Sequence, residues 1–551
     1  MQELTLVMAQ LDPLTGDIPG NAERAIEAVR EAKIEHGADV VVLPELFLAG
    51  YPPEDLLLRE SMAARIEQAR QRMAEKTVRD VLVLVGYPAE RDGRRFNMAG
   101  ALLNGEWRDE YAKRALPNYR VFDEKRYFEV GDRSCVIEHR GIRLGVLICE
   151  DLWVDEPIAD TVAAGAEVIV SLNASPWHRG KSTERVELFA ESARRAQCPL
   201  IYVNQIGGQD ELVFDGASFA LDAGGECRVQ ALAWQPGLMP IRLTRNDDGG
   251  VDIVDGELMP LPATAEESLY CALVTGVRDY VNKSGFHGVV LGLSGGIDSA
   301  LSLAIAVDAL GPDRVQAVMM PYHYTAEISR EDAAEQARTL GVHYEVLEIA
   351  PMVEAFTATL AASFEGSAAD TTEENLQSRI RGTLLMALSN KKGLMVLTTG
   401  NKSEMAVGYA TLYGDMVGGY NALKDVYKTW VYRLARWRNR QALEEGEAEC
   451  VPARVIERPP SAELSEDQLD SDSLPDYDVL DEILERYIEG DQSQEAIIAA
   501  GFDRDAVEKV VKLVDRTEYK RRQAPPGVRA TLRGFGRDRR YPIVNGWQPG
   551  D

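Results

Sequence analysis

Cysteine and histidine are scarce in this chain of 551 residues, which contains six of each. The cysteines stand at positions 135, 149, 198, 227, 271 and 450, and no two of them form a CxxC pair. Structural zinc sites and disulfide frameworks both depend on paired or regularly spaced cysteines. The pattern therefore argues against both, and most of these thiols are expected to be inert residues of the core.

Long apolar runs are also missing, and none reaches the ~18–20 residues that span a bilayer. The opening stretch MQELTLVMAQLDP carries two acidic residues and lacks the basic region of a signal peptide, so it is expected to form a first strand. We therefore expect a cytoplasmic enzyme without a membrane partner.

Positive charge is in deficit, because 60 Lys+Arg face 89 Asp+Glu and leave a net charge of −29. Such a chain repels a nucleic-acid backbone instead of neutralising it. Nucleic acid is therefore not expected as a partner, and small molecules are.

What the chain does have is enough length for two domains, since single cores usually stop growing near ~250–300 residues. Residues 1–240 alternate apolar runs with amphipathic stretches and, in places, with short strand–turn–strand patterns. Two sheets under outer helices, an αββα sandwich, satisfy both patterns. The acidic, Gly- and Pro-containing interval 246–267 is the expected linker between domains 1–245 and 268–551.

From residue 268 on, strands alternate with helices of ten or more residues, as in GVVLGL followed by ALSLAIAVDALG. That order predicts parallel βαβ units in a doubly wound sheet, whose ligands bind beyond the carboxyl ends of the strands. The turn SGGIDS, residues 294–299, lies at such a strand-to-helix junction. Free backbone N–H groups and the helix dipole favour an anion there, and glycines let phosphate approach closely.

The SGGIDS turn differs from a Walker A loop, because no lysine follows its glycines and Asp298 stands in the anion-binding position. A carboxylate beside phosphates needs a cation between them, so Asp298 is predicted to bind Mg²⁺. Ser294, Ser299 and the amides of Gly295 and Gly296 are predicted to hold pyrophosphate. The alternative is an ordinary glycine-rich turn capped by a serine.

This turn is similar to the loop of the ATP pyrophosphatases, which cleave ATP to AMP and pyrophosphate. The segments ENLQSRIRG (374–382), TTGNKSEMAVGYATLYGD (398–415), ERPPSAEL (457–464) and EYKRRQAPPG (518–527) resemble NAD synthetases. The ATP ligands that this resemblance implies are Gly292, Leu293, Ser294, Gly295, Gly296, Ile297, Asp298, Ser299, Thr399 and Ser461. The deamido-NAD ligands that it implies are Asn375, Arg379, Glu404 and Lys520. Glu404 would also join Asp298 at the metal, whereas Leu412 replaces a lysine that ammonia-dependent relatives often have.

The residues by themselves support part of this assignment. Asn375, Arg379 and Gly382 fall at i, i+4 and i+7, on one helix face, although a solvated face has the same spacing. Thr399 follows the apolar run LMVLT and so lies at the carboxyl end of a strand. Lys520, beside two arginines, suits a solvated basic patch equally well.

In the N-terminal half, Cys149 ends the apolar run LGVLIC, and Glu45, in VVLPEL, stands where another apolar run ends. A cysteine after a strand is most often only buried, but a carboxylate at the tip of a buried strand has to be paired or functional. Lys113 stands in the aromatic, proline-containing stretch YAKRALPNY. A thiolate, a carboxylate and an ammonium are the groups that attack on an amide requires.

In this order and with these flanks, Glu45, Lys113 and Cys149 resemble the Glu-Lys-Cys triad of the nitrilase superfamily, over residues 4–240. The resemblance implies a glutaminase, in which Glu150 binds the α-ammonium of the substrate. The other glutamine ligands that it implies are Tyr119, Ser175 and Lys181.

Together the two halves resemble the glutamine-dependent NAD synthetases. The resemblance implies a ligase that converts deamido-NAD, ATP, glutamine and water to NAD, AMP, pyrophosphate and glutamate, the final step of NAD biosynthesis. It also implies Mg²⁺, an adenylated deamido-NAD, a dry passage for ammonia and a homo-oligomer.

Two other interpretations stay open at this point. An ATP pyrophosphatase that acts on another carbonyl, such as a nucleotide amidotransferase, would lack ENLQSRIR and EYKRRQ. A non-enzymatic assembly module built on a degenerate nitrilase fold would not retain Glu45, Lys113 and Cys149.

Overall fold

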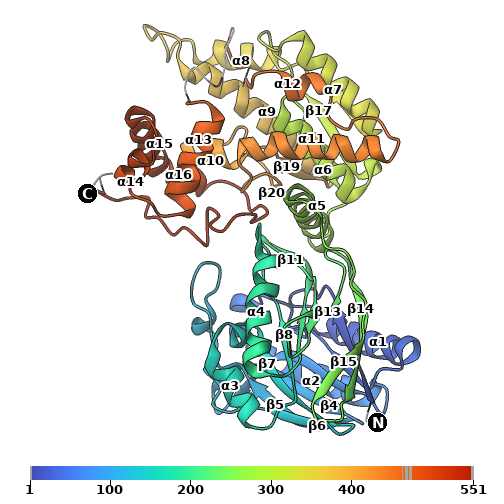
Figure 1. Ribbon diagram of the computed structural model, residues 1–551. Helices are drawn as coiled ribbons and strands as arrows, with labels where there is room; N and C mark the ends of the chain where they lie inside the picture. Colours follow the sequence, from blue (N-terminus) through green and yellow to red (C-terminus); the bar gives the residue numbers. More distant parts are fainter. Residues whose placement is uncertain (1–2, 462, 466–469, 471–473, 548–551) are drawn as a thin grey trace. The chain divides into compact units, whose positions relative to one another are not determined.

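The protein is described by a computed structural model that covers residues 3–461, 463–465, 470 and 474–547. The chain divides into two compact units, Met1–Ala263 and Thr264–Asp551 (Figure 1). None of the helices in the described part of the chain is both long and apolar enough to cross a membrane.

The first unit is built on two large sheets. Across the first sheet the strands are β15 (Val251–Asp255), β14 (Gly237–Arg245), β1 (Glu3–Gln10), β2 (Val40–Val42), β3 (Leu82–Arg91), β4 (Arg94–Leu103) and β5 (Glu106–Ala112). Across the second they are β13 (Cys227–Gln230), β12 (Phe219–Leu221), β9 (Leu200–Asn204), β8 (Val168–Asn173), β7 (Ile142–Ile148) and β6 (Val136–His139). A separate hairpin joins β10 (Ile206–Gln209) and β11 (Leu212–Asp215).

Helices cover the outer faces of these sheets (Figure 1). The helices are α1 (Ile18–His36), α2 (Ser61–Lys76), α3 (Asp155–Ala163) and α4 (Lys181–Ala196), with the short 3-10 turns η1 (Glu54–Leu58), η2 (Glu124–Arg126) and η3 (Cys149–Trp153). Strand β1 shows why the layers form, because its side chains alternate between two cores. Leu6 and Met8 join the core between the sheets, whereas Val7 and Ala9 pack under the helices. The predicted αββα sandwich is confirmed.

The interval 246–267, expected as a linker, contains β15 and the start of the next helix. Strand β15 pairs antiparallel with β14, with Ile253 opposite Leu243, and so extends the first sheet at its edge. The interval therefore contributes secondary structure to both units.

The second unit contains a five-stranded sheet in which all neighbouring strands are parallel. The strands in order are β18 (His343–Val346), β17 (Val315–Met319), β16 (Val289–Gly292), β19 (Met395–Thr398) and β20 (Tyr420–Asn421). The helices that follow the strands of the sheet or pack on it are α5 (Ala265–Lys283), α6 (Ile297–Leu310), η4 (Pro312–Arg314), α7 (Glu327–Leu340), α8 (Ala350–Leu360), α9 (Thr371–Lys392), α10 (Lys402–Val407) and α11 (Lys428–Glu444). Helix α6 contacts β16 and β17, and α9 contacts β16 and β19. The predicted doubly wound parallel sheet is confirmed.

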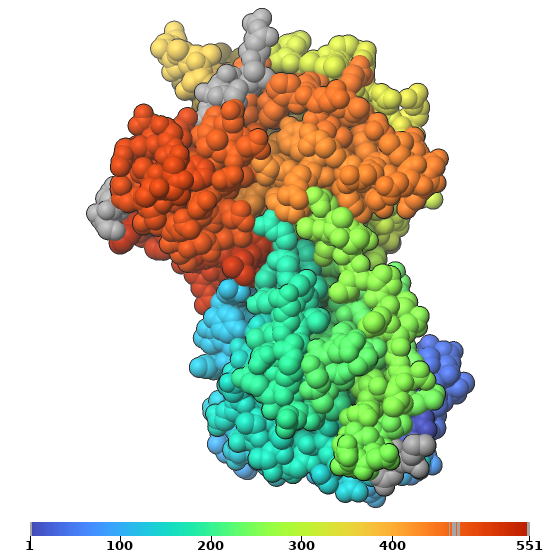
Figure 2. Space-filling view, in the orientation of Figure 1, coloured from blue at the N-terminus to red at the C-terminus, as the bar shows by residue number. Residues whose placement is uncertain are grey.

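A helical cluster follows the sheet. It contains α12 (Ala453–Glu457), α13 (Tyr477–Leu484), the π-helical turn η6 (Glu485–Glu489), α14 (Gln494–Ala499), α15 (Arg504–Arg516) and α16 (Glu518–Arg521). Apolar side chains of α13 and α15 form a core with Ala406 and Val407 of α10. In the second unit, the chain after β19, drawn in orange and red, covers much of the face seen in Figure 2.

Candidate functional site

A buried cluster of charge lies in the first unit, where β2 and β5 end. Glu45 follows β2 and Lys113 follows β5, and both side chains are fully buried. The Nζ of Lys113 lies 2.7 Å from Oε1 of Glu45 and 2.9 Å from each carboxylate oxygen of Glu124. Asn97 donates to Glu45 Oε1 at 2.7 Å, and the Ala174 amide donates to Oε2 at 3.1 Å. The carboxylate of Glu45 is thus held in one orientation.

Cys149 begins the turn η3 directly after β7, and its φ is +46°, a left-handed conformation that is strained for a residue with a side chain. Asp151, two residues on, is fully buried. Its Oδ2 accepts from the Ile148 amide at 3.0 Å, and its Oδ1 accepts from the amides of Arg114 and Ala115 at 3.0 and 2.7 Å. Asp151 therefore ties the turn that carries Cys149 to the segment that follows Lys113.

The charges of this cluster set its protonation states. Burial raises the pKa of the Cys149 thiol well above its ordinary value; Glu45 adds to the rise and Lys113 opposes it. Burial lowers the pKa of Lys113, but the carboxylates of Glu124 and Glu45 outweigh burial and raise that pKa. The result is a protonated thiol beside a permanent ammonium. A nucleophilic Cys149 therefore needs a base, and Glu45, whose charge acts on the thiol, is the carboxylate predicted for that role.

Two of the residues expected to hold glutamine, Tyr119 and Lys181, contact the same turn, through Glu150 and Trp153. Tyr119 is half exposed, and its hydroxyl donates to the carboxylate of Glu150 at 2.9 and 3.1 Å. The Ser175 amide donates to Asn204 Oδ1 at 2.9 Å. Lys181 begins α4, and its Nζ lies 3.8 Å from the ring centre of Trp153. A phenol, a carboxylate and an ammonium near one thiol suit the zwitterionic end of an amino acid.

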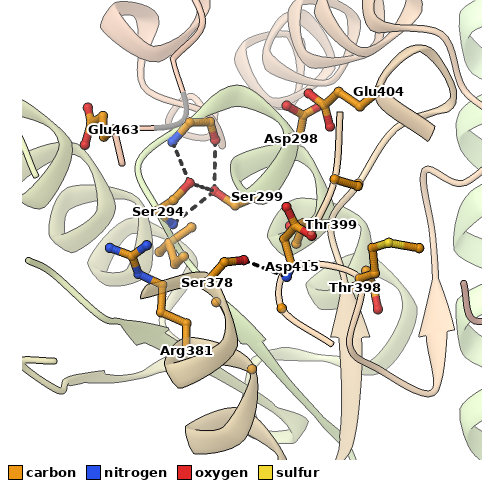
Figure 3. Close-up of a pocket in the computed structure, with 18 of the residues that line it drawn as sticks. Ser294, Asp298, Ser299, Ser378, Arg381, Thr398, Thr399, Glu404, Asp415 and Glu463 are labelled. Carbon is orange, nitrogen blue, oxygen red and sulfur yellow. Dashed lines mark hydrogen bonds between the residues drawn. The ribbon is translucent and has the colours of Figure 1, made fainter. Parts of the chain in front are cut away.

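In the second unit a cavity of about 280 Å³ opens where β16 and β19 end (Figure 3). Among its lining residues are nine of the expected ATP ligands, namely Gly292, Leu293, Ser294, Gly296, Ile297, Asp298, Ser299, Thr399 and Ser461. The tenth, Gly295, has a φ of +80°, and a Cβ there would lie 2.3 Å from the Ser329 carbonyl oxygen. Ser299 Oγ donates to the Gly296 carbonyl at 2.9 Å and accepts from the Ser294 amide at 3.2 Å, which closes the loop at the start of α6.

Two carboxylates meet at one end of this cavity. Asp298 and Glu404 lie side by side in Figure 3, and both accept from Nζ of the buried Lys428, at 2.5 and 3.0 Å. Asn401 orients the pair, because its side chain donates to Asp298 at 2.8 Å and accepts from the Glu404 amide at 3.0 Å. Burial raises the pKa of Glu404 to about 7, although Lys428 opposes the rise.

Three of the four residues expected to bind deamido-NAD do not line the cavity. They contact one segment of its wall, residues 408–412, instead. Asn375 accepts from Thr411 Oγ1 at 2.8 Å, and Arg379 donates to the Leu412 carbonyl at 3.2 Å. Lys520 donates to the carbonyls of Gly408 and Ala410, both at 2.8 Å. Only Glu404 of this group faces the cavity directly.

Comparison with known proteins decides the family. The carbon-nitrogen hydrolase model matches residues 5–247, and the NAD synthase model matches residues 269–524. The chain is 50% identical to the glutamine-dependent NAD(+) synthetase of Acinetobacter baylyi, with 100% of both chains covered. This chain belongs to the glutamine-dependent NAD(+) synthetases. The synthetase of Thermotoga maritima is 44% identical over 99% of each chain. A solved glutamine-dependent NAD+ synthetase from Acinetobacter baumannii is 48% identical over 100% of both chains, with a TM-score of 0.79.

Some residues of the two sites could not be predicted from the sequence. Glu124 lies 11 positions after Lys113, and nothing in that loop distinguishes it from the other acidic residues there. Lys428 gave no local signal, because it meets Asp298 across 130 positions of the chain. Arg381 lines the cavity two residues after the expected Arg379, and burial lowers the pKa of its guanidinium to about 10.

The residues of this synthetase fit a magnesium ion. The oxygens of Asp298 and Glu404 already converge on one cation, the ammonium of Lys428. Among the described residues no group of three His, Cys, Asp or Glu side chains could form a metal cage. Mg²⁺ is typically held by one or two carboxylates together with waters and substrate phosphates, so a pair is sufficient.

Proposed function

We propose that this chain is a carbon-nitrogen ligase that makes NAD from deamido-NAD, ATP, glutamine and water, and releases AMP, pyrophosphate and glutamate. One observation carries the proposal. The same chain contains a buried cysteine beside a lysine–glutamate pair and, in its other unit, a phosphate-type loop beside two carboxylates. The first is suited to releasing ammonia from an amide, and the second to activating a carboxylate with a nucleotide.

In the glutaminase reaction, Glu45 takes the proton of the Cys149 thiol as Sγ attacks the side-chain amide carbon of glutamine. The ammonium of Lys113 stabilises the oxyanion that forms. Glu45 then gives the proton to the leaving nitrogen, so ammonia departs and a thioester remains. Water, deprotonated by Glu45, cleaves the thioester to glutamate and restores the thiol. Tyr119, Ser175 and Lys181, with Glu150, would hold the amino-acid end of the substrate.

In the synthetase reaction, the carboxylate of deamido-NAD attacks the α-phosphorus of ATP and pyrophosphate leaves. The loop 294–299 binds the departing pyrophosphate through its amides and hydroxyls. Ammonia then attacks the activated carbonyl, and AMP leaves as NAD forms. Asp298 and Glu404 would hold Mg²⁺, which supplies charge neutralisation for the phosphates. Lys428 adds a second cation at the same end of the cavity.

The nucleotide assignment has support from a relative. The Acinetobacter baumannii structure contains adenosine diphosphate, so that protein binds an adenine nucleotide. Here Thr399 and Ser461 lie in the wall of the same cavity as the loop 294–299, in a position to contact such a nucleotide. We place deamido-NAD along the wall formed by residues 408–412, which Asn375, Arg379 and Lys520 hold in place.

The finer parts of the proposal are a requirement for Mg²⁺, a cytoplasmic location, a homo-oligomeric assembly and a division into a glutaminase domain (1–245), a linker and a synthetase domain (268–551). Each of these parts can be tested without relying on the outcome of the reaction assay. Metal removal, fractionation, sedimentation and limited proteolysis test them one at a time.

The chemistry is tested by supplying deamido-NAD, ATP and Mg²⁺ with either glutamine or ammonium. We expect NAD and AMP, not ADP, from both nitrogen sources. Cys149→Ala should lose the glutamine-dependent reaction and keep the ammonium-dependent one, whereas Asp298→Ala should lose both. A folded Cys149→Ala protein that still uses glutamine would overturn the nucleophile, and ADP as the product would overturn the adenylation.

A further inference from the structure

The C-terminal segment, residues 525–541, lies beyond the part of the chain that matches the NAD synthase model. It is nevertheless bonded to the sheet of the second unit, at β20. The Asn421 amide of β20 donates to the Pro526 carbonyl at 2.9 Å, and a Cβ on Gly527 would lie 2.1 Å from the Asn421 carbonyl oxygen. The close approach shows that the C-terminal segment packs directly on the backbone that leads from β20 to α11.

Lys402 and Asp425 form the centre of this contact. Their side chains are buried, and Nζ lies 2.7 Å from Oδ1 of Asp425. Thr531 of the C-terminal segment bridges the two, because its hydroxyl accepts from Lys402 Nζ at 2.6 Å and donates to Asp425 Oδ2 at 2.8 Å. The same Oδ2 accepts from the amides of Ala530 and Thr531, at 2.9 and 2.7 Å. Lys402 also donates to the Arg533 carbonyl at 3.1 Å.

The two residues of this ion pair stand close in sequence to residues that line the cavity. Lys402 begins α10, two residues before Glu404 and one after Asn401, and Asp425 stands three residues before Lys428. The backbone joins the two sides as well, since the Lys402 amide donates to the Val426 carbonyl at 2.8 Å. Glu404 and Lys428 are therefore carried on two strips of chain that Lys402, Asp425 and Thr531 bind together.

We propose that Lys402, Asp425 and Thr531 are positioning residues of the synthetase reaction, and that the C-terminal segment fixes Glu404 relative to Lys428. The inference rests on the proposed function of the cavity. A buried charge pair holds its geometry only when its remaining bonding positions are filled, and Thr531 fills one on each partner. A shift of about 1 Å between catalytic groups lowers a rate by roughly 100-fold.

The test compares Thr531→Val with Thr531→Ser in the full-length protein, assayed with ammonium so that the glutaminase is bypassed. Valine has nearly the shape of threonine but lacks the bridging hydroxyl, and serine keeps the hydroxyl. We expect the kcat of Thr531→Val to fall by roughly 10- to 100-fold, with the KM for ATP within about threefold of wild type. Thr531→Ser should keep a kcat close to that of wild type.

Arg438→Met is the matched control, because it breaks a different ion pair, between α11 and Asp308, ten residues beyond Lys428. It should leave kcat unchanged. If Thr531→Val keeps the wild-type kcat, or if Thr531→Ser loses as much, the inference is overturned. Should the melting curve show that Thr531→Val is unfolded, Thr531→Ala replaces it under the same two criteria. A wild-type protein that makes no NAD from ammonium would instead overturn the proposed function.

Discussion

The Nζ of Lys113 lies 2.7 Å from Oε1 of Glu45, and both side chains are completely buried. Lys113→Met leaves two carboxylates, Glu45 and Glu124, facing each other without a counterion. Removing one partner of a buried pair costs about 3–5 kcal/mol, and the lost oxyanion partner costs roughly 10²–10³-fold in glutamine hydrolysis. Denaturant unfolding and glutamate release measure the two effects. The exposed Lys125→Met in the same loop is the control and should change stability by less than about 0.5 kcal/mol.

Glu124 gives the first unit a pH dependence. Burial raises its pKa to about 7, with Lys113 opposing the rise. Because an unfolded glutamate titrates near ~4.3, the folded protein binds this proton more tightly, and the stabilisation is lost as pH rises through 7. Glu124→Gln removes the titration, so its unfolding free energy should change by about 1–2 kcal/mol less than that of wild type between pH 5.5 and 8. If denaturant unfolding shows that the unfolding free energies of the two proteins change equally with pH, Glu124 is not the titrating group.

Gly295→Ala should disable the synthetase site. Its φ is +80° and the new Cβ would lie 2.3 Å from the Ser329 carbonyl oxygen, which is backbone and cannot turn away. The loop 294–299 must therefore shift, and we expect ammonium-dependent synthesis to fall by roughly 100-fold while glutamine hydrolysis persists. Gly311→Ala is a close match, with a φ of +81° and open space around it. It should cost about 1–3 kcal/mol of stability and leave synthesis intact in the folded protein. A similar loss of synthesis in both variants would show that only backbone strain matters.

Lys520→Met tests the wall of the cavity. Lys520 donates to the carbonyls of Gly408 and Ala410. Its loss removes these two hydrogen bonds from the wall segment 408–412 and leaves the contacts of the loop 294–299 unchanged. We expect the KM for deamido-NAD to rise by at least about tenfold and the KM for ATP by less than about threefold. Steady-state kinetics with ammonium measure both, with the exposed Lys512→Met of α15 as the control. Equal rises in the two KM values would mean that Lys520 supports the whole cavity and not the dinucleotide wall.

The layers of both units could be predicted because the apolar residues of each strand and helix recur at the spacing typical of that element. The alternation of β1 and the long helices between parallel strands are local properties of the chain. Strand β15 was not predicted, because its residues, VDIVD, lie in an acidic interval without a clear strand pattern. They form a strand because they pair with β14. Residues 442–484 contain the end of α11 together with α12 and α13, although their acidic composition is typical of a loop. The acidic stretch SEDQLDSDS lies partly outside the described residues.

The residues of the candidate sites also fall into those that a local motif predicts and those that only their distant partners define. The loop 294–299 is a contiguous motif at a strand end, so its residue types and spacing were sufficient to predict it. Lys428 meets Asp298 across 130 positions and Asp425 meets Thr531 across 106, and no local pattern reports such pairings. Glu124 is only 11 positions from Lys113, but in a loop without periodicity the sequence does not show which carboxylate turns inward.

The left-handed backbone of Cys149 sets the stability of its turn against the need for a thiol at that position. A residue with a Cβ in that conformation costs about 1 kcal/mol that a glycine would not. Glycine at this position would relax the turn and remove the thiol in the same step. The proposed nucleophile therefore cannot be exchanged for the residue that would relax its turn, so the strain at position 149 is a condition of the proposed use of glutamine.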